Sequence, residues 1–210
     1  MINPPGINLL THLLPHLACE AQLPIVEADR ETMSQAVWRL HETNRDGRSV
    51  SNRGAGWQAE IVDRTPFVPV MSAIEQVARG LLGSYGLTFQ ELVFTTMWAN
   101  INFHRDFNVT HRHGGHLSGV YFLEVADGCG DLVLGSTAAF YISNPLVKKA
   151  RDAEGNNFLG HSIKPRRGQM VLFSSETNHH VDCNLSERPR LSIAWNMRVD
   201  DGADGLAART

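Results

Sequence analysis

Cysteine, positive charge and long hydrophobic runs are all scarce in this sequence, and each scarcity argues against a class of protein. The three cysteines, Cys19, Cys129 and Cys183, are too few and too far apart for a secreted disulfide framework, and no CxxC pair is present. No run of eighteen apolar residues occurs, so we expect no membrane-spanning helix. The apolar start has no basic leader and is interrupted by proline, so we expect no signal peptide and a cytoplasmic location.

The overall charge disfavours a nucleic-acid-binding protein. Lys and Arg number 19 against 22 Asp and Glu, which gives a formal net charge of −3, and the basic residues form no long run. A chain of 210 residues can bury a core of its own, so its stability requires neither a disulfide nor a structural metal. The ten histidines, several of them clustered, therefore need another explanation.

The helical signals lie in the first ninety residues. Apolar residues recur at helical spacing over 29–44, where Asp29 can cap the start, and again after a capping box formed by Ser72 and Glu75. The segment between these helices is rich in Gly, Ser and Asn, so we expect a loop with a short strand around 57–62.

From about residue 92 the sequence changes to short β-branched and aromatic runs separated by turn residues. Eight strands are predicted, at 93–103, 117–125, 130–134, 139–142, 161–164, 169–173, 179–183 and 190–199. Such a series is typical of a jelly roll or a small barrel, and the helices would cover one outer face. The predicted fold class is therefore mainly β with flanking helices, as a cupin-like jelly roll.

We predict a single domain spanning 1–210. Its helical and loop part, 1–91, would pack on a jelly-roll core at 92–200, and a tail would follow at 201–210. The polar, turn-rich segment 144–160 is predicted to be a mobile loop of the kind that closes over a site.

The segment THRHGGHLSGVYFL carries the first metal-binding signal. On a strand, residues two apart face the same side, so His111 and His113 could each give a ring nitrogen to one metal ion. Two surface imidazoles would explain this pair equally well. A second pair, His179 and His180, follows a predicted turn and strand, so two distant segments could bring imidazoles to one place.

The last predicted strand adds an anion-binding pair. Arg190 and Ser192 share one face of a strand, and the residues that alternate with them, Leu191, Ile193 and Trp195, are apolar. The planar fork of arginine can bind a carboxylate bidentately, and the serine hydroxyl adds a donor. An internal ion pair with an Asp or Glu is the alternative explanation for the arginine.

In this order and at these spacings, the motifs resemble the iron(II) and 2-oxoglutarate-dependent oxygenases, whose fold is the double-stranded β-helix. More narrowly, the chain is similar to the group of 2-oxoglutarate–iron oxygenases with an N-terminal Ser-Asn and Gly-Trp segment, which reads SNRGAGW here. The resemblance covers positions 50–200. It is carried by Ser51, Asn52, Gly56, Trp57 and Gln58, followed by WANINF at 98–103, HRHGGHLSGVYFL at 111–123, GQMVLFSS at 168–175, HHV at 179–181 and RLSIAWN at 190–196.

The resemblance implies iron(II) as the metal and 2-oxoglutarate as the co-substrate. His111, His113 and His179 would be the metal ligands, and the HHV register, like strand alternation, selects His179 over His180. Arg190 would hold the far carboxylate of 2-oxoglutarate with the help of Ser192. Strand parity gives four further candidates for contact with the co-substrate, each equally compatible with a structural role: Asn100, Asn102, Tyr121 and Asn196.

His113 stands where most relatives in the wider superfamily carry a carboxylate. Three neutral imidazoles would add no negative charge to the metal. Two alternatives stay open at this point. A carboxylate such as Asp106, Glu124 or Asp131 could complete the site, or His113 could line the pocket beside a vacant ligand position, as in the halogenating branch of the superfamily.

The activity implied by the resemblance is hydroxylation of an organic substrate by dioxygen, with conversion of 2-oxoglutarate to succinate. A cupin-type three-histidine metalloenzyme that does not use 2-oxoglutarate is one alternative, and a non-enzymatic metal-binding jelly roll is another. The expected substrate is a small molecule. We expect no nucleic-acid partner and no membrane association, and a homodimer is compatible with the sequence.

Overall fold

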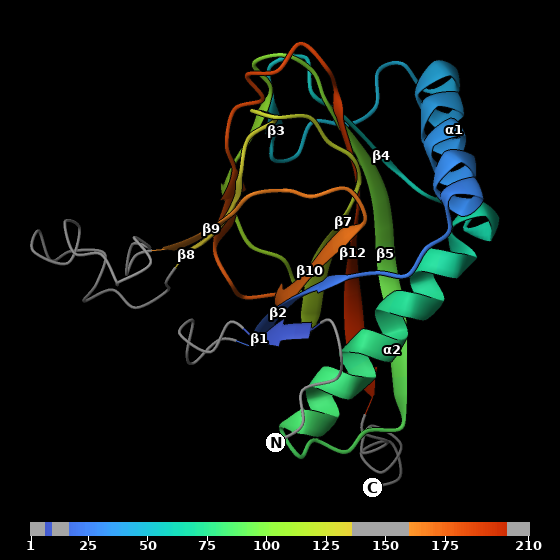
Figure 1. Cartoon of the computed structure of the whole chain (residues 1–210), viewed down its shortest axis with the longest axis vertical. Helices are drawn as coiled ribbons and strands as arrows, with labels where there is room; N and C mark the ends of the chain where they lie inside the picture. The colour runs from blue at the N-terminus through green and yellow to red at the C-terminus, as the bar shows by residue number, and fades with distance from the viewer. Residues whose placement is uncertain (1–6, 10–16, 136–159, 201–210) are drawn as a thin grey trace, which may run out of the picture.

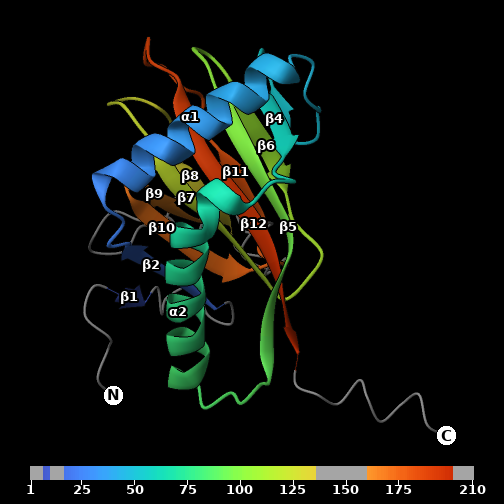
Figure 2. The same ribbon diagram turned by 90° about the vertical axis from the view of Figure 1, so that its right-hand side faces the viewer.

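The computed structural model describes residues 7–9, 17–135 and 160–200. The predicted strand at 139–142, nearly all of the predicted loop at 144–160 and the predicted tail lie outside these ranges. Within them the chain forms two antiparallel β-sheets around a common interior, and two α-helices cover the outer face of the larger sheet (Figures 1 and 2). Neither of these helices has the length and apolar character that a membrane crossing requires.

The larger sheet has the strand order β1-β2-β10-β7-β12-β5-β4. Its strands are β1 (Ile7–Leu9), β2 (Ala18–Gln22), β4 (Trp57–Glu60), β5 (Glu91–Asn102), β7 (Leu117–Glu124), β10 (Gln169–Ser174) and β12 (Arg190–Asp200). The long strands β5 and β12 pair from Arg190 opposite Asn102 to Asp200 opposite Glu91. This pairing fixes the position of Arg190 at one end of the barrel.

The smaller sheet has the order β3-β6-β11-β8-β9. Its strands are β3 (Asn52–Arg53), β6 (Phe107–His111), β8 (Leu132–Gly135), β9 (Gly160–Ile163) and β11 (His179–Val181). From β5 onward the chain passes back and forth between the two sheets, which is the winding of a double-stranded β-helix. The predicted fold class is confirmed, and the segment before residue 92 contributes β1 to β4 to these sheets in addition to the helices.

Two hydrophobic cores hold the layers together. The first lies between the larger sheet and the helices α1 (Glu27–Thr43) and α2 (Val68–Ser84), and it includes Met33, Ile74 and Trp195. The second fills part of the barrel interior and consists of Ala18, Phe122, Leu132, Leu134, Ile163, Val171 and Phe173. Polar side chains line the rest of the interior, where the site described below is found.

Both helices begin earlier than their sequence signals predict. α1 starts at Glu27, so Asp29 lies in its first turn, and the N-cap residue Val26 offers no side-chain cap. α2 starts at Val68 with a proline in its first turn, where the missing N–H costs no hydrogen bond. Ser72 therefore lies inside the helix rather than at its cap.

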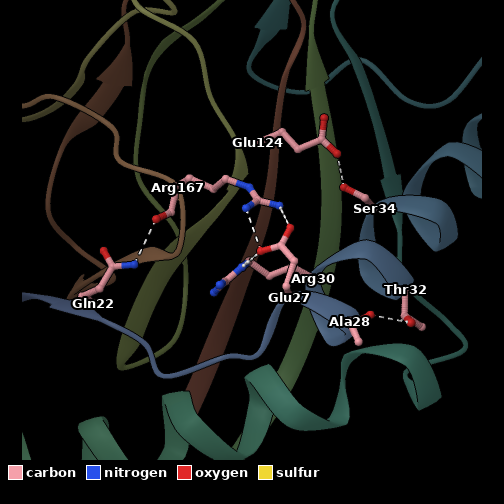
Figure 3. Close-up of polar contacts among 8 residues, drawn as sticks. All are labelled: Gln22, Glu27, Ala28, Arg30, Thr32, Ser34, Glu124 and Arg167. Carbon is pink, nitrogen blue, oxygen red and sulfur yellow. Dashed lines mark hydrogen bonds and ion pairs between the residues drawn. The ribbon is translucent and has the colours of Figure 1, made fainter.

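A surface cluster ties α1 to the sheet (Figure 3). Arg167, in the turn before β10, donates to both carboxylate oxygens of Glu27, with Nη1 2.8 Å from Oε2, and Arg30 Nε lies 3.1 Å from Oε2. These guanidinium contacts lower the pKa of Glu27 to about 2. Further along the helix, the hydroxyl of Ser34 donates to Glu124 on β7.

Candidate active site

Three histidines from two segments converge inside the barrel. His111 ends β6, His113 follows two residues later, and His179 begins β11 directly opposite His111. One ring nitrogen of each lies within 4.8 Å of the others, and the ring centroids are between 4.2 and 4.9 Å apart. In the described part of the chain, this is the only group of three or more His, Cys, Asp or Glu side chains placed to share a metal ion.

Backbone carbonyls determine which ring nitrogens face the cluster. Nδ1 of His111 lies 2.7 Å from the carbonyl oxygen of Val109, and Nδ1 of His179 lies 2.9 Å from that of Thr177. A carbonyl oxygen only accepts, so each Nδ1 carries the proton and donates it. Nε2 of both rings therefore keeps its lone pair for a metal ion, which is the usual arrangement around ligand histidines.

Burial keeps the three imidazoles uncharged at neutral pH. Burial first and the neighbouring His111 second lower the pKa of His179 to about 3 and that of His113 to about 4. Burial also lowers the pKa of His111, against the opposing effect of its bond to the Val109 carbonyl. The neutral form is the one that binds metal.

The second histidine of the HHV motif points elsewhere. His179 is 5% exposed and belongs to the cluster, whereas Nε2 of His180 lies 3.4 Å from the exposed carboxylate of Asp182. Adjacent residues on β11 thus face opposite sides, as strand alternation predicts.

The three carboxylates considered as alternative ligands are engaged away from the cluster. Asp106 accepts the backbone N–H groups of Ala55 (2.7 Å) and Phe103 (2.6 Å). Glu124 accepts the hydroxyl of Ser34, and Asp131 accepts that of Ser162 at 2.7 Å. The donor set that the structure brings together therefore consists of three imidazoles.

An inner cavity of about 60 Å³ joins the histidines to Arg190 and Ser192. Strand pairing places polar side chains in a row along one wall of this cavity. Gln58 on β4 lies opposite Asn100 on β5, and Asn100 lies opposite Ser192 on β12. Arg190 lies opposite Asn102 in the neighbouring row. All five of these polar side chains line the cavity.

Arg190 is a buried cation with an unused donor. The residue is only 1% exposed, and its Nη1 donates to the carbonyls of Cys129 (2.8 Å) and Gly130 (3.0 Å). Nε has no hydrogen-bond partner, and no carboxylate of the described residues forms a salt bridge with this guanidinium. Burial lowers the pKa of Arg190 to about 10, so the group stays charged at neutral pH. A carboxylate entering the cavity would fit this donor.

The other sequence candidates fall into three different places. Asn100 and Asn102 line the inner cavity, and Asn102 donates to Asn108 at 3.1 Å. Asn196 does not line it and instead donates to Thr96 at 2.9 Å. The expectation that Tyr121 contacts the co-substrate is wrong, because this side chain lies on the opposite face of β7, buried in the core beneath the helices.

Several residues lining the inner cavity were not among the sequence candidates. Ser51 begins the SNRGAGW segment and Gln58 follows it directly, so the signal for them was present in the motif. Asn108, which donates to the hydroxyl of Ser51 at 3.0 Å, lies on β6, a strand without a clear sequence signal.

Residues 96–196 match the family model described as “Putative 2OG-Fe(II) oxygenase”. This range contains the three clustered histidines, Arg190 and Ser192. No curated protein matches the chain significantly in sequence.

Solved structures of low sequence identity share the fold. A prolyl-4-hydroxylase from Pseudomonas putida is 18% identical, with a TM-score of 0.58 over 90% of this chain and 96% of that chain. A prolyl hydroxylase from Trichoplax adhaerens, in complex with a hypoxia inducible factor peptide fragment, is 14% identical, with a TM-score of 0.60 over 92% and 87%. The epimerase SnoN, in complex with Fe3+, α-ketoglutarate and nogalamycin RO, is 13% identical, with a TM-score of 0.59 over 88% and 78%.

These structural likenesses agree with the double-stranded β-helix traced by the two sheets. The family match covers the residues of the histidine cluster and the buried arginine. An enzyme that uses iron and 2-oxoglutarate needs groups of these two kinds. Over residues 96–196 the chain matches the 2OG-Fe(II) oxygenase family, and with this site it is a 2-oxoglutarate-dependent oxidoreductase that uses dioxygen.

Proposed function

We propose that His111, His113 and His179 bind iron(II), and that Arg190 and Ser192 bind 2-oxoglutarate, for the hydroxylation of a small organic substrate with release of succinate and CO2. The observation that carries this proposal is that a buried arginine with a free Nε lines the same cavity as three neutral imidazoles. When bound, the iron supplies the activation of dioxygen, coupled to decarboxylation of the keto acid.

The protein groups would act by positioning. Arg190 and Ser192 would hold the far carboxylate of 2-oxoglutarate, and the keto acid end would then face the imidazoles across the cavity. Nε2 of His111 and of His179 is kept available by the proton that each Nδ1 donates to a backbone carbonyl. With imidazole in all three positions, the protein adds no charge to the metal.

Apolar side chains would limit water at the site. Phe122, Leu132, Phe173 and Val181 line the inner cavity beside the polar residues. The ring of Phe173 lies 4.8 Å from that of His179. Such walls lower the local dielectric constant and strengthen the attraction between Arg190 and a bound carboxylate.

The test is anaerobic addition of iron(II) and 2-oxoglutarate to the full chain. We expect a visible charge-transfer band, and succinate once oxygen is admitted. Loss of the band in His179→Ala, together with retention in His180→Ala, would tie the signal to the cluster. A chain that binds iron but gives no band, and forms no succinate in oxygenated buffer, would refute the proposal.

The variant Arg190→Gln distinguishes the proposed oxygenase from the cupin-type alternative. This change should weaken 2-oxoglutarate binding roughly 10- to 150-fold in the proposed enzyme and leave metal-dependent turnover intact in an enzyme that does not use the keto acid.

Four further expectations stay predictions: a single domain, a cytoplasmic location, a homodimer, and no nucleic-acid partner. The three cysteines are free, which accords with a reducing compartment. Size-exclusion chromatography with light scattering would decide the oligomeric state.

A further inference from the structure

An outer cavity of about 270 Å³ adjoins the histidine cluster. It shares five lining residues with the inner cavity: Ser51, Gln58, Trp98, His111 and His113. A molecule in the outer cavity would therefore lie beside two of the three clustered imidazoles. If 2-oxoglutarate fills the inner cavity, the outer one is the space left for the substrate.

The outer cavity carries unopposed positive charge. Arg48 and Arg112 line it, both are exposed, and neither side chain forms a hydrogen bond or ion pair with another described residue. No Asp or Glu among the described residues lines this cavity. Two free guanidiniums thus meet in one cavity of a chain whose net charge is −3.

The backbone around Arg48 is held in place. Its N–H donates to the carbonyl of Gln58 at 2.8 Å, and its carbonyl accepts the buried side-chain amide of Asn52 at 3.3 Å. The other end of that amide accepts the N–H of Val50 at 2.9 Å. Asn52 and Gln58 both belong to the segment that carries the family resemblance, so this segment fixes the backbone of Arg48 as well as lining the inner cavity.

Arg112 is positioned by the histidines on either side of it. His111 is paired in β6, and the N–H of His113 donates to the carbonyl of Ser175 at 2.9 Å. The backbone of Arg112 is therefore held by hydrogen bonds of both neighbouring residues. The remaining wall of the cavity includes the ring of Trp98, 5.3 Å from that of His113, and the side chains of Val50 and Val109.

We infer that the outer cavity binds the substrate through an anionic group, a carboxylate or a phosphate, held by Arg48 and Arg112, with an apolar portion against Trp98 and the two valines. Arginine suits this task because its planar fork matches both kinds of oxyanion. A cavity of about 150 Å³ accommodates benzene, so the observed space accommodates an aryl ring with a short acidic arm. That the bound molecule is oxidised rests on the proposed function, whereas its binding does not.

The experiment is a calorimetric titration of three probes into the full chain: 3-phenylpropionate, its neutral amide, and phenyl phosphate. Iron(II) and saturating 2-oxoglutarate are present without oxygen, so that Arg190 is occupied, and ionic strength is fixed because exposed charges are screened by salt. We expect at least one anion to bind about tenfold or more tightly than the amide. The anion that shows this preference identifies the substrate group as a carboxylate or a phosphate.

Variants assign the preference to the two arginines. The double variant Arg48→Gln/Arg112→Gln should lose it, and Arg48→Lys/Arg112→Lys should keep part of it because the charge remains. Arg45→Gln is the matched control, since it removes a neighbouring exposed charge that does not line the cavity. Thermal unfolding of each variant checks that the fold is intact.

Equal binding of acid and amide, no binding of either anion at millimolar concentration, or an equal loss in the Arg45→Gln control would each overturn the inference. Failure of the proposed function looks different. In that case no visible band and no succinate are found, while the anion preference persists in the unmodified chain and disappears in the double glutamine variant.

Discussion

Among the described residues that line the inner cavity, Arg190 is the only lysine or arginine, and replacing it with glutamine removes its charge. A hydrogen bond to a charged group contributes about 1.5 to 3 kcal/mol, which corresponds to a roughly 10- to 150-fold weaker affinity for 2-oxoglutarate. Lysine at this position keeps the charge but loses the planar fork, so we expect an intermediate loss. Anaerobic titration of the charge-transfer band measures both affinities directly.

The same substitution also affects stability, and the two effects can be separated. Arg190 Nη1 satisfies the carbonyls of Cys129 and Gly130, and leaving them unpaired should cost about 1 to 3 kcal/mol. For a chain of this length that lowers Tm by about 2 to 12 °C. Titrations well below Tm therefore report affinity rather than unfolding.

Controls isolate the role of the guanidinium. Arg188→Gln removes an exposed charge two residues away and should leave the 2-oxoglutarate affinity unchanged. Binding of Mn(II), followed by electron paramagnetic resonance, should be retained in Arg190→Gln because the histidines are unaltered. If Arg190→Gln bound 2-oxoglutarate as tightly as the unmodified chain, the assignment of this residue would be refuted.

Three further predictions concern folding and reactivity. The arginine contacts of Glu27 lower its pKa to about 2, so its contribution to stability is present above its unfolded pKa of about 4.3 and is lost as the pH falls towards 2. The Tm difference between Glu27→Gln and the unmodified chain should therefore shrink over that range. A constant Tm difference would contradict this. Burial raises the pKa of Cys19 to about 12, so a variant that keeps only this cysteine should react with a disulfide reagent at pH 8 in urea and not when folded. A Cβ at Gly119 would overlap the buried ring of Trp195, so Gly119→Ala should destabilise the chain by about 1 to 3 kcal/mol in urea unfolding, whereas Gly83→Ala, which meets no atom within 4 Å, should not.

The central strands could be predicted from the sequence because they are long and strongly apolar. The predicted strands at 93–103, 117–125, 169–173 and 190–199 correspond to β5, β7, β10 and β12. Buried strands of this kind carry a signal of their own, since burial on both faces requires a continuous apolar run.

The short strands β1, β2, β3 and β6 were missed for a physical reason, whereas β4, β8, β9 and β11 lie where short strands were predicted. β2 consists of Ala, Cys, Glu and Gln, residues of weak or average strand preference, and it forms because β1 and β10 pair with it. β3 contains only two residues and β6 only five, so their pairing is decided by contacts distant in sequence.

Part of the site could likewise be predicted from the sequence, and part could not. The order of the histidines and the Arg-x-Ser pair predicted the groups that meet in the inner cavity. The error at Tyr121 arose because Val120, Tyr121, Phe122 and Leu123 form an apolar run without alternation, so the sequence does not indicate which of them face the interior. Arg48 and Arg112 could not be singled out, because the sequence does not distinguish an exposed loop arginine beside a cavity from any other exposed loop arginine.

The central claim is that three imidazoles and no protein carboxylate hold the iron. Crystals grown anaerobically with iron(II) and 2-oxoglutarate, measured on both sides of the iron absorption edge, would locate the ion by its anomalous signal. We predict one ion bonded to Nε2 of His111 and His179 and to one ring nitrogen of His113, with a carboxylate of 2-oxoglutarate on Arg190. An ion bonded to Asp106, Glu124 or Asp131, or one that leaves any of the three histidines unbound, would contradict the account.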